Sequence, residues 1–83
     1  MRVVKVKGTS FRSASVAASI HARRVAVVHE LGNVHDANAL RVELDGHHVG
    51  YLPRGTVLSP DARFEVFKVG TEPLPHVWLV RTA

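Results

Sequence analysis

The sequence has 83 residues, a formal net charge of +4 and no cysteine. These values predict one domain, residues 1–83, with a thin core, because a domain this small buries only about 60–65% of its unfolded surface. They exclude disulfides and thiolate zinc sites. No apolar run approaches the roughly 20 residues of a membrane-spanning helix, and the first residues do not resemble a signal peptide. We therefore expect a soluble, cytoplasmic protein that does not bind membranes and whose positive charge favours polyanionic partners.

A strand, a short helix and a second strand are expected first along the chain. Residues 2–7 alternate lysine with valine, which predicts a strand with one basic face. Ser10 or Ser13 is placed to cap a short helix over residues 14–20, where apolar residues recur at helical spacing. Residues 24–30 again alternate and predict the second strand.

A polar loop and a hairpin are expected in the middle of the chain. Residues 32–38 are mostly polar, and Asp45-Gly46 then separates two alternating runs at 39–44 and 47–52. Asp-Gly between such runs is a strong hairpin signal, because glycine takes the positive φ of a tight turn. A loop braced by a rigid hairpin is a common place for binding residues.

The last third is expected to hold a helical turn between Pro53 and Pro60, and then two more strands. Residues 63–69 alternate so that either phase can face inward, and residues 77–81 predict the final strand. About six strands at this regular spacing predict an all-β fold with one or two short helices, a small OB-like or SH3-like β-barrel. A thin domain needs its large side chains inside, so the expected core includes Phe11, Phe64, Phe67 and Trp78.

Three segments resemble the HIRAN domain, and the resemblance runs in order over nearly the whole chain, about residues 3–81. They are Gly8-Thr9-Ser10-Phe11, Glu30-x-x-Asn33-x-His35-Asp36-x-Asn38-Ala39-Leu40, and Val49-Gly50-Tyr51-Leu52-Pro53-Arg54. The resemblance implies a small β-barrel with an OB-like core. Members of the family occur alone in bacteria and phages, and at the N-terminus of Swi/Snf-type DNA translocases that remodel stalled replication forks. There the domain binds single-stranded DNA and recognises a free 3′-hydroxyl end.

The resemblance implies that Asp36 is the carboxylate that accepts a hydrogen bond from the 3′-hydroxyl. An ionised carboxylate only accepts hydrogen bonds, and it repels a 3′-phosphate. Asn33 and Asn38 match the asparagine pair that flanks this residue. Asparagine and aspartate also bond their own backbone readily, so a role for Asp36 in shaping its loop stays open.

The resemblance also points to residues that contact bases and phosphates. His35 and Lys5 stand where fork-remodelling members carry stacking aromatic residues, and Lys5 offers no such surface; a lost base stack costs about 1–3 kcal/mol. Tyr51 offers an aromatic face or a hydroxyl near the loop. The candidate phosphate contacts, chosen because they adjoin the elements that hold the loop, are Lys5, Lys7, Arg12, Arg41 and Arg54.

Two other kinds of site are less favoured by the sequence. A metal site from His29, His35, Asp36, His47 and His48 matches no zinc motif, and adjacent residues of a strand, such as His47 and His48, point to opposite faces. The sequence also lacks a cysteine nucleophile, a glycine-rich phosphate loop and a Ser-His-Asp arrangement. We therefore expect no enzyme activity, no cofactor and no metal.

The sequence thus predicts a non-catalytic module that binds single-stranded DNA at free 3′ ends during DNA repair or replication-fork processing. A helicase, translocase or nuclease acting in trans is the expected protein partner. The alternative is a protein-interaction or assembly module of the same fold without DNA-end binding. A metal-dependent hydrolase is the third and least favoured function.

Overall fold

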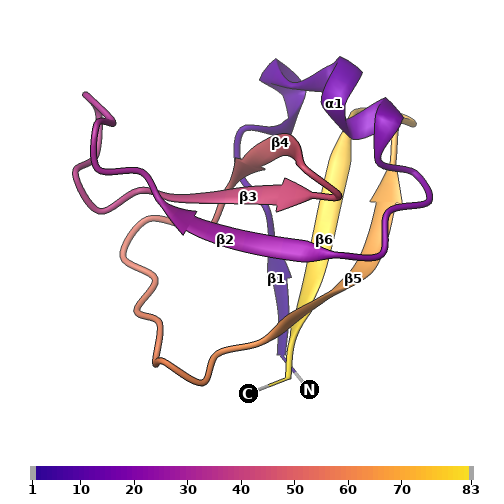
Figure 1. Ribbon diagram of the computed structural model, residues 1–83. Helices are drawn as coiled ribbons and strands as arrows, with labels where there is room; N and C mark the ends of the chain where they lie inside the picture. The colour runs from indigo at the N-terminus through magenta and orange to yellow at the C-terminus, as the bar shows by residue number, and fades with distance from the viewer. Residues whose placement is uncertain (1, 83) are drawn as a thin grey trace.

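The computed structural model describes residues 2–82 as two three-stranded antiparallel sheets and a short helix (Figure 1). One sheet has the order β1-β6-β5 and the other β2-β3-β4. The elements are β1 (Arg2–Lys5), a 3-10 turn (Thr9–Phe11), α1 (Ser13–Ala18), β2 (Val25–His29), β3 (Leu40–Leu44), β4 (His47–Tyr51), β5 (Phe64–Gly70) and β6 (His76–Arg81). The predicted all-β class with about six strands is confirmed.

The two sheets are not closed into a barrel, which corrects that part of the prediction. They are joined at one corner, where the N–H of Lys7 donates to the carbonyl of Tyr51 at 2.7 Å and the reverse bond is 2.9 Å. Within residues 2–82, β2 pairs only with β3, and β5 pairs only with β6. Their outer edges stay unpaired, so the ring of strands remains open between β2 and β5.

The β3–β4 hairpin has the predicted turn. Asp45 and Gly46 have φ angles of 48° and 87°, the positive values that a two-residue hairpin turn requires. The Asp45 carboxylate also accepts the backbone N–H of Arg24 at 2.8 Å and that of Arg23 at 3.2 Å. The turn therefore also fixes the chain that enters β2.

The core between the sheets is aliphatic. Its buried residues are Val6, Val16, Val42, Leu44, Val49, Leu52, Val77 and Leu79. Val16 places α1 over one end of this core, and Phe64 packs against it. Phe11 is 90% exposed, Phe67 is 54% exposed, and Trp78 is half-buried outside the core, so the predicted core positions of these three residues are wrong. The inward positions of both sheets are filled by valine and leucine, which leaves no interior site for these rings.

A β-bulge in β5 decides which of its residues face inward. The pairing with β6 shifts between Val66 and Lys68. Val66 and Val69 pack against the core, whereas Phe67 and Lys68 are both exposed. One strand thus follows one alternating phase before the bulge and the other phase after it.

Two local predictions about helices are wrong. Arg12 is the N-cap residue of α1, and no side chain caps it, so neither Ser10 nor Ser13 has the expected role. Between Pro53 and Pro60 the chain makes a turn without a helix, because Gly55 takes a left-handed φ of 83° that ends any helical continuation. No helix within residues 2–82 is long and apolar enough to cross a membrane.

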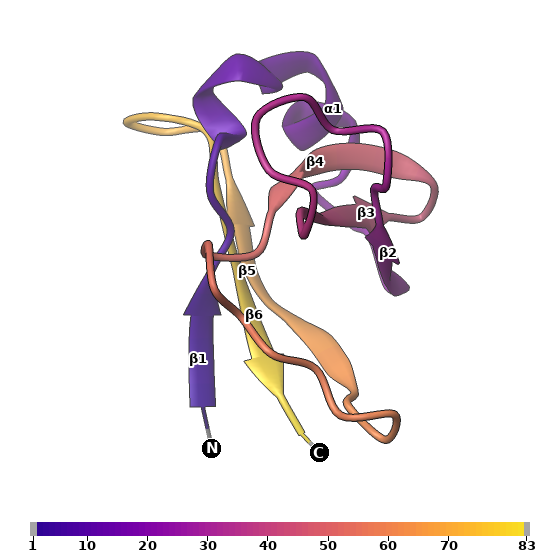
Figure 2. The ribbon, with the colours of Figure 1, turned by 90° about the vertical axis from the view of Figure 1, so that its left-hand side faces the viewer.

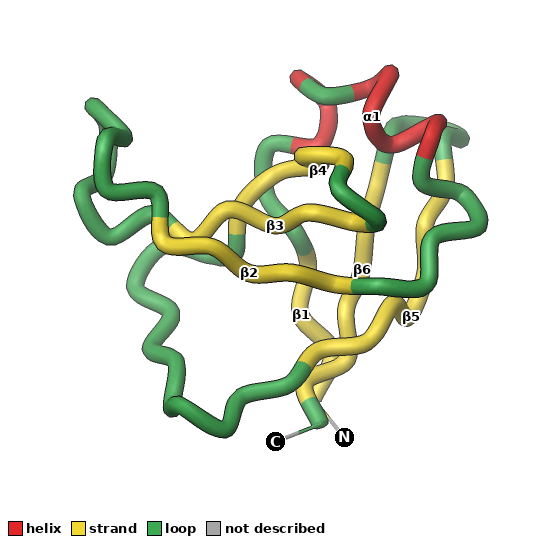
Figure 3. The backbone as a smooth tube through the Cα atoms, in the orientation of Figure 1, coloured by secondary structure: helices red, strands yellow, loops and turns green. Residues whose placement is uncertain are grey.

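Two long loops, residues 30–39 and 52–63, project from the same side of the molecule (Figure 3). Figure 2 shows this side facing the viewer, with the 30–39 loop above the 52–63 loop. The chain ends lie away from the 30–39 loop, where Arg2 pairs with Arg81 across β1 and β6. The first loop contains the expected site.

Candidate nucleic-acid interface

The 30–39 loop is shaped by its own asparagine and aspartate side chains. Asn33 Oδ1 accepts the backbone N–H groups of His35 and Asp36 at 2.8 and 2.9 Å. Asp36 Oδ1 accepts the N–H of Asn38 at 2.9 Å, which is an Asx turn. One oxygen of Asp36 therefore has the structural role that the sequence left open. Its second oxygen, Oδ2, lies 3.5 Å from Nε of Arg54.

Glu30 is the residue to which the sequence assigned no role, and it holds this loop against the hairpin. Its Oε1 accepts the hydroxyl of Tyr51 at 2.9 Å and the side-chain amide of Asn33 at 3.0 Å. Its Oε2 pairs with Arg41 at 3.3 Å. The hydrogen bond from Tyr51, followed by that from Asn33, lowers the pKa of Glu30 below its usual value of 4.5. The Glu-x-x-Asn spacing was the only sequence signal for this arrangement.

The candidate phosphate contacts differ in how free their charges are. Arg41 pairs with Glu30 and also with Glu43, whose carboxylate oxygen is 2.8 Å from Nε. The charge of Arg54 is more accessible to a phosphate, because its side chain is 77% exposed. Its guanidinium also donates to the backbone carbonyl of His35 at 2.8 Å. Arg12 is exposed at the start of α1.

A groove of about 530 Å³ between the two long loops brings most of the predicted site together. We call it the Asp36 groove. Its floor is apolar and includes Leu40, Leu52 and Pro53. The predicted site residues that line it are Lys7, Asn33, His35, Asp36, Asn38, Tyr51 and Arg54. Lys5, Arg12 and Arg41 do not line it.

The ring and the hydroxyl of Tyr51 are both engaged in contacts within the domain. Its ring meets the ring of His48 edge-on, with centroids 5.0 Å apart, and its hydroxyl is bound to Glu30. Burial, together with the Glu30 bond, raises the pKa of Tyr51. Burial also lowers the pKa of His48, with a further contribution from the charge of Arg12. These contacts hold the Tyr51 side chain in place at the edge of the groove.

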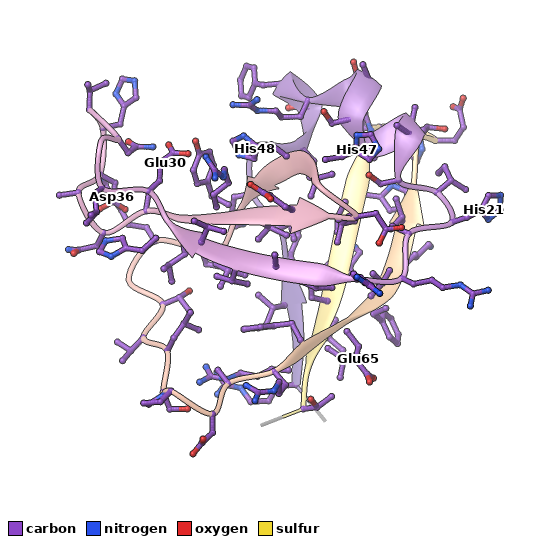
Figure 4. All side chains as sticks on the ribbon, in the orientation of Figure 1. His21, Glu30, Asp36, His47, His48 and Glu65 are labelled. Atoms are coloured by element: carbon purple, nitrogen blue, oxygen red, sulfur yellow. The ribbon has the colours of Figure 1, made fainter. Side chains whose placement is uncertain are left out.

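The histidines do not assemble with acidic residues into a metal centre in the described part of the chain. Residues 2–82 contain no group of three or more histidine, aspartate or glutamate side chains placed to hold a metal ion. In Figure 4, Glu30 and Asp36 lie together near the loop after β2, whereas His47 lies at the opposite end of the hairpin. His47 is exposed and His48 is half-buried, as expected for neighbours on a strand.

Comparisons with known proteins do not place the chain in a family. The resemblance to HIRAN domains therefore depends on the three motif segments, and two of them, around Asp36 and Tyr51, border the Asp36 groove. The first segment, at Gly8 and the residues that follow, lines an adjoining groove. No protein-family model, curated protein or solved structure matches this chain.

Proposed function

We propose that this domain is a non-catalytic module that binds single-stranded DNA and selects a free 3′-hydroxyl end. The observation that carries the proposal is the Asp36 groove, where one carboxylate and two cations, Lys7 and Arg54, stand above an apolar floor. An apolar floor suits a base, the cations suit phosphates, and the carboxylate suits a hydroxyl donor. In this role the domain would deliver DNA ends to a helicase, translocase or nuclease acting in trans.

Asp36 can select the end because its two oxygens are differently engaged. Oδ1 is held by the backbone N–H of Asn38, which fixes the direction of the carboxylate. Within residues 2–82, the polar contact of Oδ2 is the 3.5 Å approach of Nε from the exposed Arg54 guanidinium. A 3′-hydroxyl donates to Oδ2 while Arg54 turns to the preceding phosphate. A terminal phosphate would instead meet a negative charge.

The other predicted contacts support this arrangement to different degrees. His35 is exposed beside Asp36 and offers its ring to a base. Lys7 and Arg54 provide the phosphate contacts in the groove, with Arg12 as a more distant cation. Arg41 is better described as a support for Glu30, because two carboxylates already pair with it.

The test is fluorescence anisotropy with a labelled short strand at low salt, ending in either a 3′-hydroxyl or a 3′-phosphate. The wild type should bind the hydroxyl end more tightly, and Asp36→Asn should bind both ends alike. Asparagine keeps an oxygen for the Asx turn, so this change removes the charge and leaves the loop in place. Asp61→Asn, at an exposed position before β5, is the matched control and should keep the preference. Equal binding of both ends by the wild type would contradict the proposal.

A protein-interaction or assembly module is the second candidate, favoured by apolar side chains at the loop tips. Leu31 and Val34 are 77% and 89% exposed in the 30–39 loop, and Val57 is 81% exposed in the 52–63 loop. Exposed apolar side chains on one side of a small domain are typical of contact surfaces. A lack of binding to either oligonucleotide at low salt would favour this function.

A further inference from the structure

The outer face of the β1-β6-β5 sheet carries a tryptophan between two lysines. Val77 and Leu79 are fully buried, so Trp78 between them faces away from the core. Trp78 pairs with Lys5 of β1 on one side and with Lys68 of β5 on the other. The Nζ of Lys5 lies 5.7 Å from the centroid of the Trp78 ring. The three side chains thus form a row across the sheet.

The β5 bulge adds a second aromatic residue to this face. It leaves Phe67 outside the regular pairing, next to Lys68, with 54% of its surface exposed. We call Lys5, Trp78, Phe67 and Lys68 the Trp78 platform. Glu65, opposite Val80, is an exposed acidic residue on the same strand. Two aromatic rings beside two lysines have the chemistry of surfaces on which single-stranded nucleic acids stack.

A basic groove connects this platform with the Asp36 groove. It measures about 390 Å³, runs between residues 8–10 and 73–76, and is lined by Lys5 and Lys7 without any acidic residue. Lys7 also lines the Asp36 groove. Val6 between the two lysines is buried, so both lysines face outward, about 6.6 Å apart along the strand. Cations therefore follow one another from Asp36 to Trp78.

We propose that the Trp78 platform binds bases of the same single strand several nucleotides 5′ of the end held at Asp36. This inference rests on the proposed function. It adds the direction in which the DNA strand crosses the domain and the length of DNA that the domain contacts. The strand runs from Asp36 past Lys7 and Lys5 onto Trp78 and Phe67. Lys5 then contacts the DNA at nucleotides before its 3′ end. The stacking surface that Lys5 itself lacks is provided by its neighbour Trp78.

Tryptophan fluorescence measures this contact directly, because Trp78 is the only tryptophan of the protein. The experiment titrates 3′-hydroxyl oligothymidylates from about two to about ten nucleotides, within the length range that small binding domains cover. Anisotropy measures binding, and tryptophan emission measures stacking on the platform. The shortest strands should bind without changing the emission. Longer strands should quench it and bind about tenfold more tightly.

Variants separate the platform from general charge. Lys5→Gln should weaken binding of the long strands several-fold and leave the shortest unchanged. Arg63→Gln, which removes one exposed positive charge just before β5, is the matched control and should affect all lengths alike. Trp78→Phe should retain the length dependence of affinity, and Trp78→Leu should lose it.

The outcomes distinguish this inference from the proposed function. Long strands that keep the 3′-hydroxyl preference but leave the emission unchanged would overturn the inference alone. Quenching by the shortest strands, or equal quenching by an acidic peptide, would also overturn it. Loss of the 3′-hydroxyl preference in the wild type would contradict the proposed function, and with it the placement of the platform 5′ of the end.

Discussion

At the scale of single residues, Glu30 and His48 couple the candidate site to pH in different ranges. Glu30 is ionised and bonded to the Tyr51 hydroxyl, the Asn33 amide and the Arg41 guanidinium. His48 is half-buried beside Tyr51, and its Nε2 is buried without a hydrogen-bond partner in the described structure. Folding therefore favours the charged form of Glu30 and the neutral form of His48.

Glu30→Gln should flatten the acid side of the stability profile. The lowered pKa means that the unfolded chain takes up a proton near pH 4.5 while the folded protein still resists it. Wild-type stability from this group is present above pH 4.5 and is lost as the pH falls through the lowered pKa. The urea midpoint measured against pH should show a smaller acid loss in Glu30→Gln, which is also less stable near pH 7. Glu65→Gln is the exposed control, and parallel profiles for Glu30→Gln and wild type would refute this role.

His48→Gln should remove a loss of stability that begins at milder acidity. The pKa of His48 is lowered, first by burial and then by Arg12, so the unfolded chain binds a proton near pH 6.5 before the folded protein does. Wild-type stability should fall as the pH drops from about 6.5 toward the lowered pKa. The urea midpoints at pH 7.5 and 5.5 measure the effect. His47→Gln, at the exposed neighbour, should retain the wild-type difference; if both variants behave alike, His48 is not responsible.

At the scale of elements, the hairpin turn depends on the left-handed conformation of Gly46. Gly46→Ala should destabilise the protein by about 1 kcal/mol, because a Cβ is disfavoured at a φ of 87°. The free space around Gly46 means that this cost comes from the backbone alone. Chemical denaturation measures it. Gly32→Ala, where space is also open and φ is not in this range, should cost far less, and an equal cost at both positions would argue against the explanation.

The elements that sequence predicted well are those with local signals. The strands and the hairpin follow from alternation and from Asp45-Gly46, and the loop that carries Asp36 follows from its polar residues. The β5 bulge could not be predicted, because it depends on pairing with β6. Without it, the phase of Phe67 stays undecided, and Trp78 looks like a core residue although it faces outward.

The same limit applies to the candidate site. The loop residues around Asp36 line one groove, as expected from their closeness in sequence. Arg41 meets carboxylates from two separate parts of the chain, Glu30 and Glu43, and no local pattern shows that its charge is already paired. Lys5 faces Trp78, which is 73 positions away, so its place beside the adjoining groove became visible only in the fold.

At the scale of the whole molecule, the two sheets meet where Gly50 passes over the chain at Lys7. A Cβ on Gly50 would collide with the Lys7 carbonyl and the Val6 side chain. Gly50→Ala should therefore cost about 1–3 kcal/mol, a large part of the stability of a small domain. Because Lys7 would move, binding of 3′-hydroxyl strands should weaken as well.

Thermal unfolding and anisotropy together check this joint. Gly70→Ala is the matched control, because the added Cβ there meets the imidazole ring of His76 and not the backbone. It should cost less and leave the preference for a 3′-hydroxyl end unchanged. If Gly70→Ala costs as much as Gly50→Ala, tight packing in general would explain the loss, and the corner between the sheets would have no special importance.

Because Arg2 pairs with Arg81, residues near the two ends of the described chain lie side by side. A short linker between residues 2 and 82 would close the chain, and new ends could be opened in the exposed turn at Pro60 and Asp61. For the same reason, the domain could be inserted into a surface loop of another protein, because the two junctions with that loop would lie close together. Figures 1 and 2 show the ends well away from the 30–39 loop, so such an insertion would leave the Asp36 groove open to solvent.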